Sequence, residues 1–165
     1  MSKTRGVLYV HSAPSALCPH VEWAAGAVFG APVRLDWTAQ PVERSSYRAE
    51  YSWSGPAGTA AKLASALKGW QRIRYEVTEE PSLGAEGERY SYTPALGVFH
   101  ATTGIHGDIL VSEDRIKQAV VSASLGGTDL QRALDRLLGG PWDAELEPFR
   151  YAGEGTTVRW LHEVG

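Results

Sequence analysis

Two histidines and an aspartate lie close together in the stretch FHATTGIHGDIL, residues 99–110. A histidine hydrogen-bonded to a carboxylate is the common core of general-base sites and metal sites, and Asp108 follows His106 by two positions. Thr103 adds a hydroxyl, and the nearby glycines would let the backbone approach a ligand closely. The stretch therefore indicates His100, Thr103, His106 and Asp108 as candidates for binding a ligand.

The same stretch also has a purely structural interpretation, which we favour. It holds no obvious nucleophile, and a histidine followed by glycine and aspartate is common in turns. One histidine and one carboxylate are fewer ligands than zinc usually takes, so we expect no bound metal. We expect no cofactor either. In this interpretation His100 is partly buried in a strand, and His106 and Asp108 belong to the turn that follows.

A second set of possible zinc ligands comprises His11, Cys18, His20 and Glu22. Their spacing matches no standard zinc site, and on a helix residues i and i+2 point apart. Cys18 is therefore expected to be a small buried thiol. It is the single cysteine, so it cannot form an intramolecular disulfide, which suits a reducing compartment and favours a cytoplasmic protein.

A glycine-rich segment, GPAGTAAK at residues 55–62, begins a predicted helix. Because a helix N-terminus attracts anions, Gly58, Thr59 and Lys62 are candidates for an anion site. The segment lacks the GxxxxGK[ST] pattern of a phosphate-binding loop, however, and glycine, proline and threonine are also ordinary helix-entry residues. The sequence alone leaves both interpretations open.

The spacing of apolar side chains predicts the elements that must position these residues. Strands are expected at 7–10, 33–38, 46–54 and 71–80, and helices at 19–30 and within 55–70. Most of these strands alternate aromatic or aliphatic residues with charged ones, as in a sheet with one buried face. The order strand–helix–strand–strand–helix–strand predicts a ferredoxin-like (βαββαβ) core over residues 1–80.

Residues 81–165 are predicted to extend this core. We expect a β-hairpin over 88–101, helices over 112–124 and 128–138, and two short strands at 145–151 and 156–164. The chain is thus expected to be one α+β domain, residues 1–165, in which the β-hairpin and a C-terminal helical hairpin complete the core. If the β-hairpin pairs beside the fourth strand, His11 and the loop after His100 lie at opposite ends of the sheet and cannot share a metal.

Charged side chains on the predicted strands lie opposite the aromatic ones. They are Arg34, Asp36, Arg48, Glu50, Arg72, Arg74 and Glu76, and Leu8 and Val10 are expected at the centre of this patch. If the two helices cover the aromatic face, the charged face is free to stay in water. It could equally dock the helical hairpin, a peptide or a second subunit, which would give a homodimer through the open sheet face.

Charge and hydropathy argue against two classes of partner. The formal net charge is −3 with acids and bases interspersed, and without a basic stripe nucleic acid and anionic membranes are poor partners. The apolar run after the start MSKTRG is only VLYV, and no later stretch approaches the length of a membrane span. A protein partner or a small-molecule ligand is what remains.

Several long strings of the sequence resemble a known family. They are RGVLYVHSAP, LCPHVEWA, KLASALKGW, YEVTEEPS and GERYSYTPALGVFHATTGIHGDIL, and together they span roughly residues 5–112. These strings resemble the actinobacterial family called domain of unknown function 3145. The resemblance implies a cytosolic actinobacterial protein of housekeeping character. It implies no catalytic residue, because the family has no established activity.

Two functions are compatible with these observations. The first is a non-catalytic ligand- or protein-binding module, or a regulatory one, that acts through the sheet face or the glycine-rich loop after His100. The second is a small enzyme that uses His106 or His100 as acid or base, with Asp108 orienting it. We favour the binding module, because the sequence shows neither a nucleophile nor a metal motif. Convergence of these side chains in a pocket would favour the enzyme.

Overall fold

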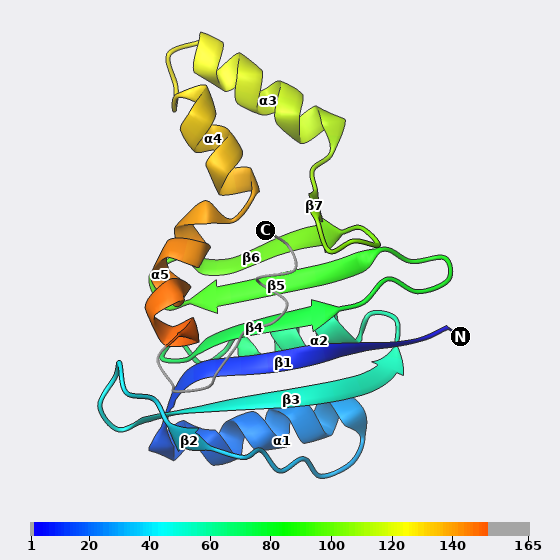
Figure 1. The fold of residues 1–165 in the computed structure, drawn as a ribbon, viewed down its shortest axis with the longest axis vertical. Coiled ribbons are helices and arrows are strands. Elements are labelled where there is room, and N and C mark those ends of the chain that lie inside the picture. The colour runs from blue at the N-terminus through cyan, green and yellow to red at the C-terminus, as the bar shows by residue number, and fades with distance from the viewer. Residues whose placement is uncertain (1, 152–165) are drawn as a thin grey trace.

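A seven-stranded antiparallel sheet forms the centre of the molecule in the computed structural model, which describes residues 2–151 (Figure 1). Its strands are β1 (Lys3–Pro14), β2 (Thr38–Ala39), β3 (Ser46–Pro56), β4 (Arg74–Glu79), β5 (Gly87–Thr93), β6 (Gly97–Thr103) and β7 (Ile109–Leu110). They lie in the order β2-β3-β1-β4-β5-β6-β7. The α+β class is confirmed, and the β5–β6 hairpin pairs beside β4, which is the arrangement that separates His11 from the loop after His100.

Five α-helices accompany the sheet. They are α1 (Cys18–Phe29), which follows the short 3-10 helix η1 (Ser15–Leu17), α2 (Thr59–Leu67), α3 (Glu113–Ser124), α4 (Leu130–Leu137) and α5 (Gly140–Arg150). Pro19 lies in the first turn of α1, where its missing N–H is not needed. The helix ends at Gly30, whose φ of 71° is left-handed and favours glycine.

The main core lies between the sheet and helices α1 and α2. Its fully buried members include Leu8, Val10, Val21, Leu63, Leu67, Ile73, Tyr75 and Val77, and Trp53 is nearly as buried. The predicted aromatic face is thus confirmed, with Tyr47 and Tyr51 packed against it half-buried. The placement of Leu8 and Val10 on the opposite face was wrong. Strand β1 is apolar on both faces here, so its alternation could not decide which side chains turn inward.

The strand predicted at 33–38 is also wrong over most of its length. Only Thr38 and Ala39 pair with β3, while the preceding residues are irregular. Val33 and Leu35 are nonetheless buried, and the Leu35 amide donates to the Glu22 carboxylate on α1 at 2.7 Å. The segment is therefore held partly by its contact with α1, and only its last residues form backbone hydrogen bonds with the sheet.

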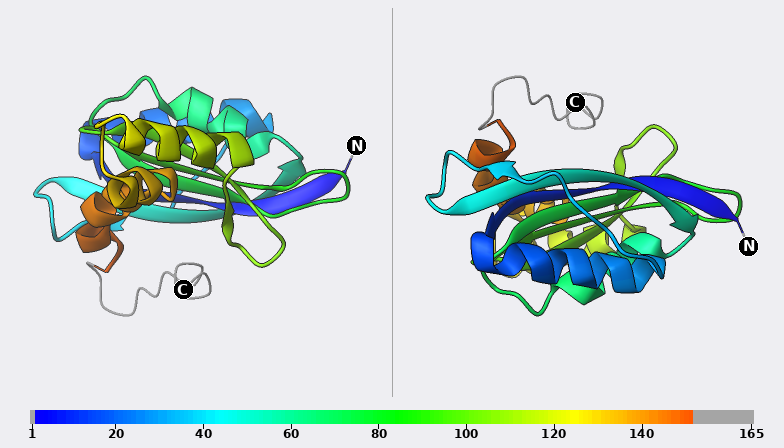
Figure 2. Two further views of the ribbon diagram at one scale, coloured as in Figure 1. Left: turned by 90° about the horizontal axis from the view of Figure 1, so that it is seen from above. Right: turned by 90° about the horizontal axis from the view of Figure 1, so that it is seen from below.

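Helix α5 covers part of the sheet face opposite α1 and α2 (Figure 2). The strand predicted at 145–151 is wrong, because most of this segment belongs to α5. Trp142, Leu146 and Phe149 are buried at helical spacing. Gly139, with a left-handed φ of 81°, turns the chain into the helix. The second predicted strand, 156–164, lies outside the described residues.

Helices α3 and α4 form a hairpin that we call the arm, residues 113–138. It projects beyond the β6–β7 side of the sheet (Figure 1). Ser112 accepts a hydrogen bond from the Arg115 amide at the start of α3, and Asp129 does the same for Arg132 in α4. Within residues 2–151, no helix has the length and apolar character needed to cross a membrane.

Candidate functional site

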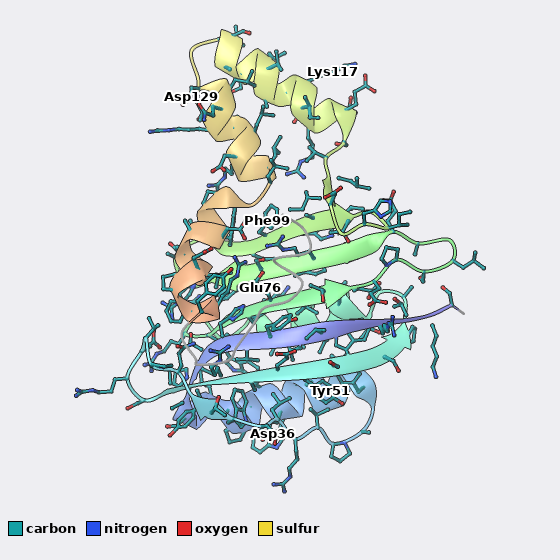
Figure 3. All side chains as sticks on the ribbon, in the orientation of Figure 1. Asp36, Tyr51, Glu76, Phe99, Lys117 and Asp129 are labelled. Atoms are coloured by element: carbon teal, nitrogen blue, oxygen red, sulfur yellow. The ribbon has the colours of Figure 1, made fainter. Side chains whose placement is uncertain are left out.

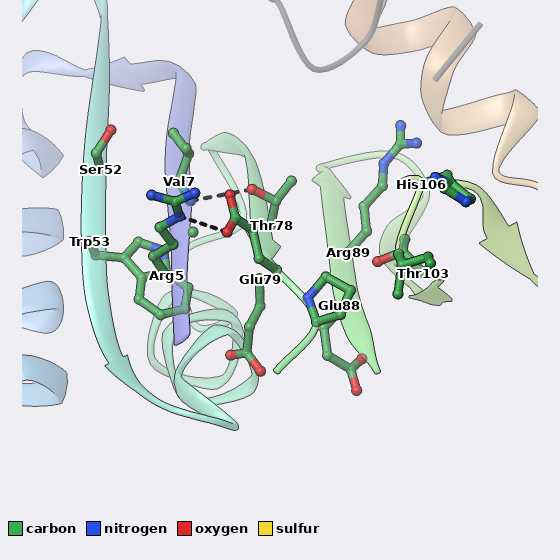
Figure 4. Close-up of a pocket in the computed structure, with 16 residues that line it drawn as sticks. Arg5, Val7, Ser52, Trp53, Thr78, Glu79, Glu88, Arg89, Thr103 and His106 are labelled. Atoms are coloured by element: carbon green, nitrogen blue, oxygen red, sulfur yellow. Dashed lines mark hydrogen bonds and ion pairs between the residues drawn. The ribbon is translucent and has the colours of Figure 1, made fainter. Parts of the chain in front are cut away.

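The sheet face that carries α5 has two distinctive features. Under α5 lies a group of charged side chains that we call the charge cluster, comprising His11, Glu76, Arg89, Asp143 and Arg150. Beyond the cluster, toward the other end of the same face, the surface forms a hollow of about 770 Å³ (Figure 4). Arg89 belongs to both features.

Glu76, on β4, is the centre of the charge cluster and is fully buried beneath α5 (Figure 3). Its Oε1 accepts hydrogen bonds from His11 Nε2 and Arg150 Nε, both at 2.8 Å. Its Oε2 accepts from Arg150 Nη2 at 2.9 Å and from Ser91 Oγ at 3.1 Å. The two-pronged contact with Arg150 is the geometry in which guanidinium binds carboxylate most specifically.

His11 enters the charge cluster from β1, at a point where the pairing of that strand is irregular. The pairing register of β1 shifts between Val10 and Ser12 against β4, as at a β-bulge. His11 faces the same side of the sheet as Tyr9, as alternate residues of a strand do, and the two rings stack with centroids 6.0 Å apart. His11 is only 2% exposed.

The charges of the cluster balance one another. Arg89 Nη2 lies 2.9 Å from Asp143 Oδ1 and 3.5 Å from Glu76 Oε2, and Arg150 Nη2 lies 2.9 Å from the same Asp143 oxygen. Two guanidinium groups thus face two carboxylates. Burial alone would raise the pKa of Glu76, but its hydrogen bonds and charge interactions with His11 and Arg150 outweigh burial and lower it to about 2. A carboxylate with so low a pKa stays ionised near neutral pH and is a poor group for proton transfer there. Its contacts with Arg150 instead indicate a structural role in holding α5 on the sheet.

The hollow is built from the strands at the end away from α5. Its floor includes Ser52, Thr78, Arg89 and Thr103, which come from β3, β4, β5 and β6. Its rim includes Arg5 and Glu80, and the turn at residues 104–107. Its volume falls in the range of small-molecule sites.

Almost all charged groups of the hollow already have partners in the protein. Arg5 Nε donates to Glu80 Oε2 at 2.7 Å, and Arg89 is held by the charge cluster. Glu79 accepts from two backbone amides of the α2 entry, and Glu88 is hydrogen-bonded to His100. By contrast, within residues 2–151 the hydroxyls of Ser52 and Thr103 make no hydrogen bond.

The structure separates the four ligand-binding candidates. Thr103 and His106 line the hollow. His100 lies on the other side of β6, where its ring stacks on that of Tyr90 with centroids 4.5 Å apart. Its side chain is exposed, so the expectation that it is partly buried was wrong. Asp108 is exposed, and its backbone oxygen accepts from the Gly104 amide at 2.9 Å to close the turn. No hydrogen bond joins it to either histidine among the described residues.

The predicted anion site at the start of α2 holds a carboxylate of the chain itself. Glu79 Oε2 accepts from the Gly58 amide and Oε1 from the Ala60 amide, both at 3.0 Å. The Thr59 hydroxyl donates to the Pro56 carbonyl at 2.6 Å. Lys62 is exposed. The amides that would attract an external anion are therefore occupied by Glu79.

The zinc-type residues near the N-terminus point apart. Cys18 is buried, and burial raises the pKa of its thiol. His20 packs against the edge of Trp23, with ring centroids 5.1 Å apart, whereas His11 faces Glu76. Among residues 2–151 there is no group of three or more His, Cys, Asp or Glu arranged to hold a metal.

Sequence reasoning missed the charge cluster. It placed Glu76 correctly on the side opposite the aromatic residues but expected it to face water, and it put Arg150 in a strand. The partners of Glu76 lie 65 residues away at His11 and 74 away at Arg150, so no local spacing could have joined them. One available signal was a lone glutamate between Tyr75 and Val77 on a buried strand.

One comparison with known proteins identifies the family of the chain. Residues 7–163 match the family described as protein of unknown function, DUF3145. The chain belongs to this family. The resemblance inferred from residues 5–112 is thereby confirmed, and the match extends it through the charge cluster and α5. Comparisons with curated proteins and with solved structures found no match.

Proposed function

We propose that this member of the DUF3145 family is a non-catalytic binding module whose ligand lies in the hollow against the turn at 104–107. One observation carries the proposal. Of the ionisable side chains that line the hollow, all except His106 are engaged with partners inside the protein. The unused hydrogen-bonding groups of Ser52 and Thr103 are uncharged.

The class of ligand follows from this contrast between ionisable side chains, which almost all have partners, and hydroxyl groups that have none within residues 2–151. A charged ligand would have to compete with an existing ion pair, such as Arg5 with Glu80, and would leave one partner uncompensated. A neutral polar molecule can instead use the hydroxyls and the backbone of the turn, where glycines admit close approach. We therefore assign the hollow to an uncharged, hydroxyl- or amide-bearing small molecule.

The alternative of a small enzyme receives little support from the geometry. A general base must lie within hydrogen-bond reach of its orienting group and its substrate. His106 lines the hollow without Asp108, and His100 is paired with Glu88 on the opposite side of β6. A protein partner at this face would have to fit beside α5, so a small ligand is the better match.

Titrations monitored by amide NMR test the proposal. The probes are glucose and acetamide as neutral molecules, with acetate and guanidinium as charged ones. We expect the neutral probes to shift the amide resonances of Gly104, Gly107 and Thr78, and Thr103→Val to reduce these shifts. Thr102→Val, on the other side of β6, is the matched control. The proposal fails if only charged probes bind, or if the two variants behave alike.

We also propose finer assignments of fold and location. A ferredoxin-like class for residues 1–80 is supported by the order β2-β3-β1-β4, by the antiparallel pairing and by two helices on one face. The shortness of β2 is a departure from that pattern. A single domain over residues 1–165 and a cytoplasmic location, suited to the one buried thiol, complete the proposal.

A further inference from the structure

The arm carries large apolar side chains that the described part of the chain leaves uncovered. They are Ile116, Val120, Val121, Leu125, Leu130 and Leu138, each at least 39% exposed. In α3 the one buried residue is Ala119, and α4 has none. Elsewhere in the fold, helices α1, α2 and α5 each bury several residues against the sheet.

Helix α4 shows most clearly that this surface needs a cover. Its leucines and alanine follow helical spacing on one side, and Gln131, Arg132, Asp135 and Arg136 occupy the other. A helix of eight residues is marginal in water unless its apolar side packs against something. On α3, Ile116 and Val120 stand one turn apart and flank Ala119, the residue buried within the hairpin.

We propose that the cover is the arm of a second copy of this chain. A two-helix hairpin with one apolar side is half of a four-helix bundle, and two such hairpins close the core of the bundle. We define the arm face as Ile116, Val120, Leu130, Leu134 and Leu138; the exposed Val121 and Leu125 lie outside it. The arm projects past the sheet, so two arms can meet while the two sheets stay apart (Figure 1).

The charges of the arm fit a second copy. Its acids are Glu113, Asp114, Asp129 and Asp135, and its bases are Arg115, Lys117, Arg132 and Arg136. The arm is therefore neutral in a chain whose net charge is −3. Two identical arms meet without net repulsion, whereas a strongly charged partner would find no complementary surface.

The size of the arm predicts a weak dimer. The 12 residues of α3 span about 18 Å, and the two helices side by side are about 20 Å wide. Two such faces, each of about 360 Å², bury on the order of 700 Å² in total, which is below the roughly 1,000 Å² of a stable specific interface and fits a weak, transient one. The dimer should therefore form and dissociate with protein concentration.

Sedimentation velocity of the full chain over a concentration series tests the proposal. We expect the mass to rise from the monomer value of 17.9 kDa toward twice that value as concentration increases. The double variant Val120→Glu with Leu138→Glu should stay monomeric throughout. Leu83→Glu changes a side chain that is 93% exposed outside the arm, and it should dimerise like the unchanged protein. Circular dichroism confirms that all three chains are folded.

Three results would overturn the proposal. If the double variant still dimerises, the interface lies elsewhere, for example on the open sheet face. If the unchanged chain is monomeric at every concentration and hydrogen exchange shows α3 and α4 protected, residues 152–165 of the same chain provide the cover. If it is monomeric and the arm is unprotected, the arm face has no occupant.

Discussion

The carboxylate of Glu76 fastens α5 to the sheet through charge as well as through packing. It is fully buried, and its hydrogen bonds come from His11, Ser91 and Arg150. A buried ion pair adds little to the stability of the fold compared with a pair of apolar residues in the same place. Removing only one partner is costly, however, because the other charge then stays buried without compensation. The role of Glu76 can therefore be tested by a single substitution.

Glu76→Gln should lower the free energy of unfolding by about 3–5 kcal/mol, because it removes the buried carboxylate that Arg150 contacts through both Nε and Nη2, whereas the Asp143 carboxylate beside that guanidinium is partly exposed. Urea denaturation followed by circular dichroism measures the change. Glu50→Gln removes an exposed carboxylate from β3, in the same sheet, and should alter the free energy by less than about 0.5 kcal/mol. Equal effects of the two variants would contradict a fastening role for Glu76.

The low pKa of Glu76 also predicts how stability responds to acid. The folded pKa of about 2 lies below the ordinary value of 4.5. The stabilisation is therefore complete above pH 4.5 and is lost as the pH falls toward 2, because the unfolded chain binds a proton first. Urea midpoints between these pH values should fall steeply for the unchanged protein and less steeply for Glu76→Gln. Parallel curves would assign the acid response to other carboxyl groups.

Cys18 should behave as an inert structural thiol. It is buried, and burial raises its pKa, so little thiolate is present at neutral pH. Labelling by a chromogenic disulfide reagent should therefore be slow in the folded protein and fast in urea. Rapid labelling of the folded chain would indicate an activated thiolate.

At the scale of elements, α5 shows where local patterns mislead. Glu145, Leu146 and Glu147 alternate as in a short strand, and Pro148 argues against a helix interior. The helical spacing of Trp142, Leu146 and Phe149 emerges only when the helix is known to start at Gly140. The core strands were predictable because aromatic and charged residues alternate along β3, whereas β1 is apolar on both faces and was assigned the wrong inward side.

Trp142→Ala tests how α5 is docked. The indole packs against Phe99 with ring centroids 5.0 Å apart, and its Nε1 donates to the Gly97 carbonyl at 2.9 Å. Loss of this buried side chain should cost about 3–5 kcal/mol in urea denaturation. Trp23→Ala is the matched control, since Trp23 is 68% exposed on α1 and should cost far less. A small loss for Trp142→Ala would mean that the ion pairs alone hold α5.

For the whole molecule, the arm should be the least protected helical unit of the monomer. Its helices bury one residue between them, whereas α1 and α2 pack on the sheet. Local opening requires least free energy where few apolar contacts are lost. Hydrogen exchange at a concentration low enough to keep the chain monomeric should therefore be faster in α3 and α4 than in α1, α2 or β4. Uniform protection would contradict this expectation.

Only the part of the candidate site whose residues are close together in the sequence could be predicted. Residues 99–110 point to the turn beside the hollow, because glycines and polar side chains mark turns in any sequence. Thr103 and His106 accordingly line the hollow. The rest of the hollow comes from strands that meet only in the folded sheet, so spacing along the chain could not reveal Arg5, Ser52 or Arg89 as neighbours.

The pairing of Glu76 with Arg150 also bears on the order in which the protein is made. A ribosome adds residues from the N-terminus, so β4 is complete while the 74 residues that separate Glu76 from Arg150 are still to come. During this interval α1 and α2 can already pack on one face of the sheet, but the Glu76 carboxylate needs water to solvate it. The second face can therefore close only after residue 150 has left the ribosome. We therefore expect Glu76 to become buried late, after most of the chain has been synthesised.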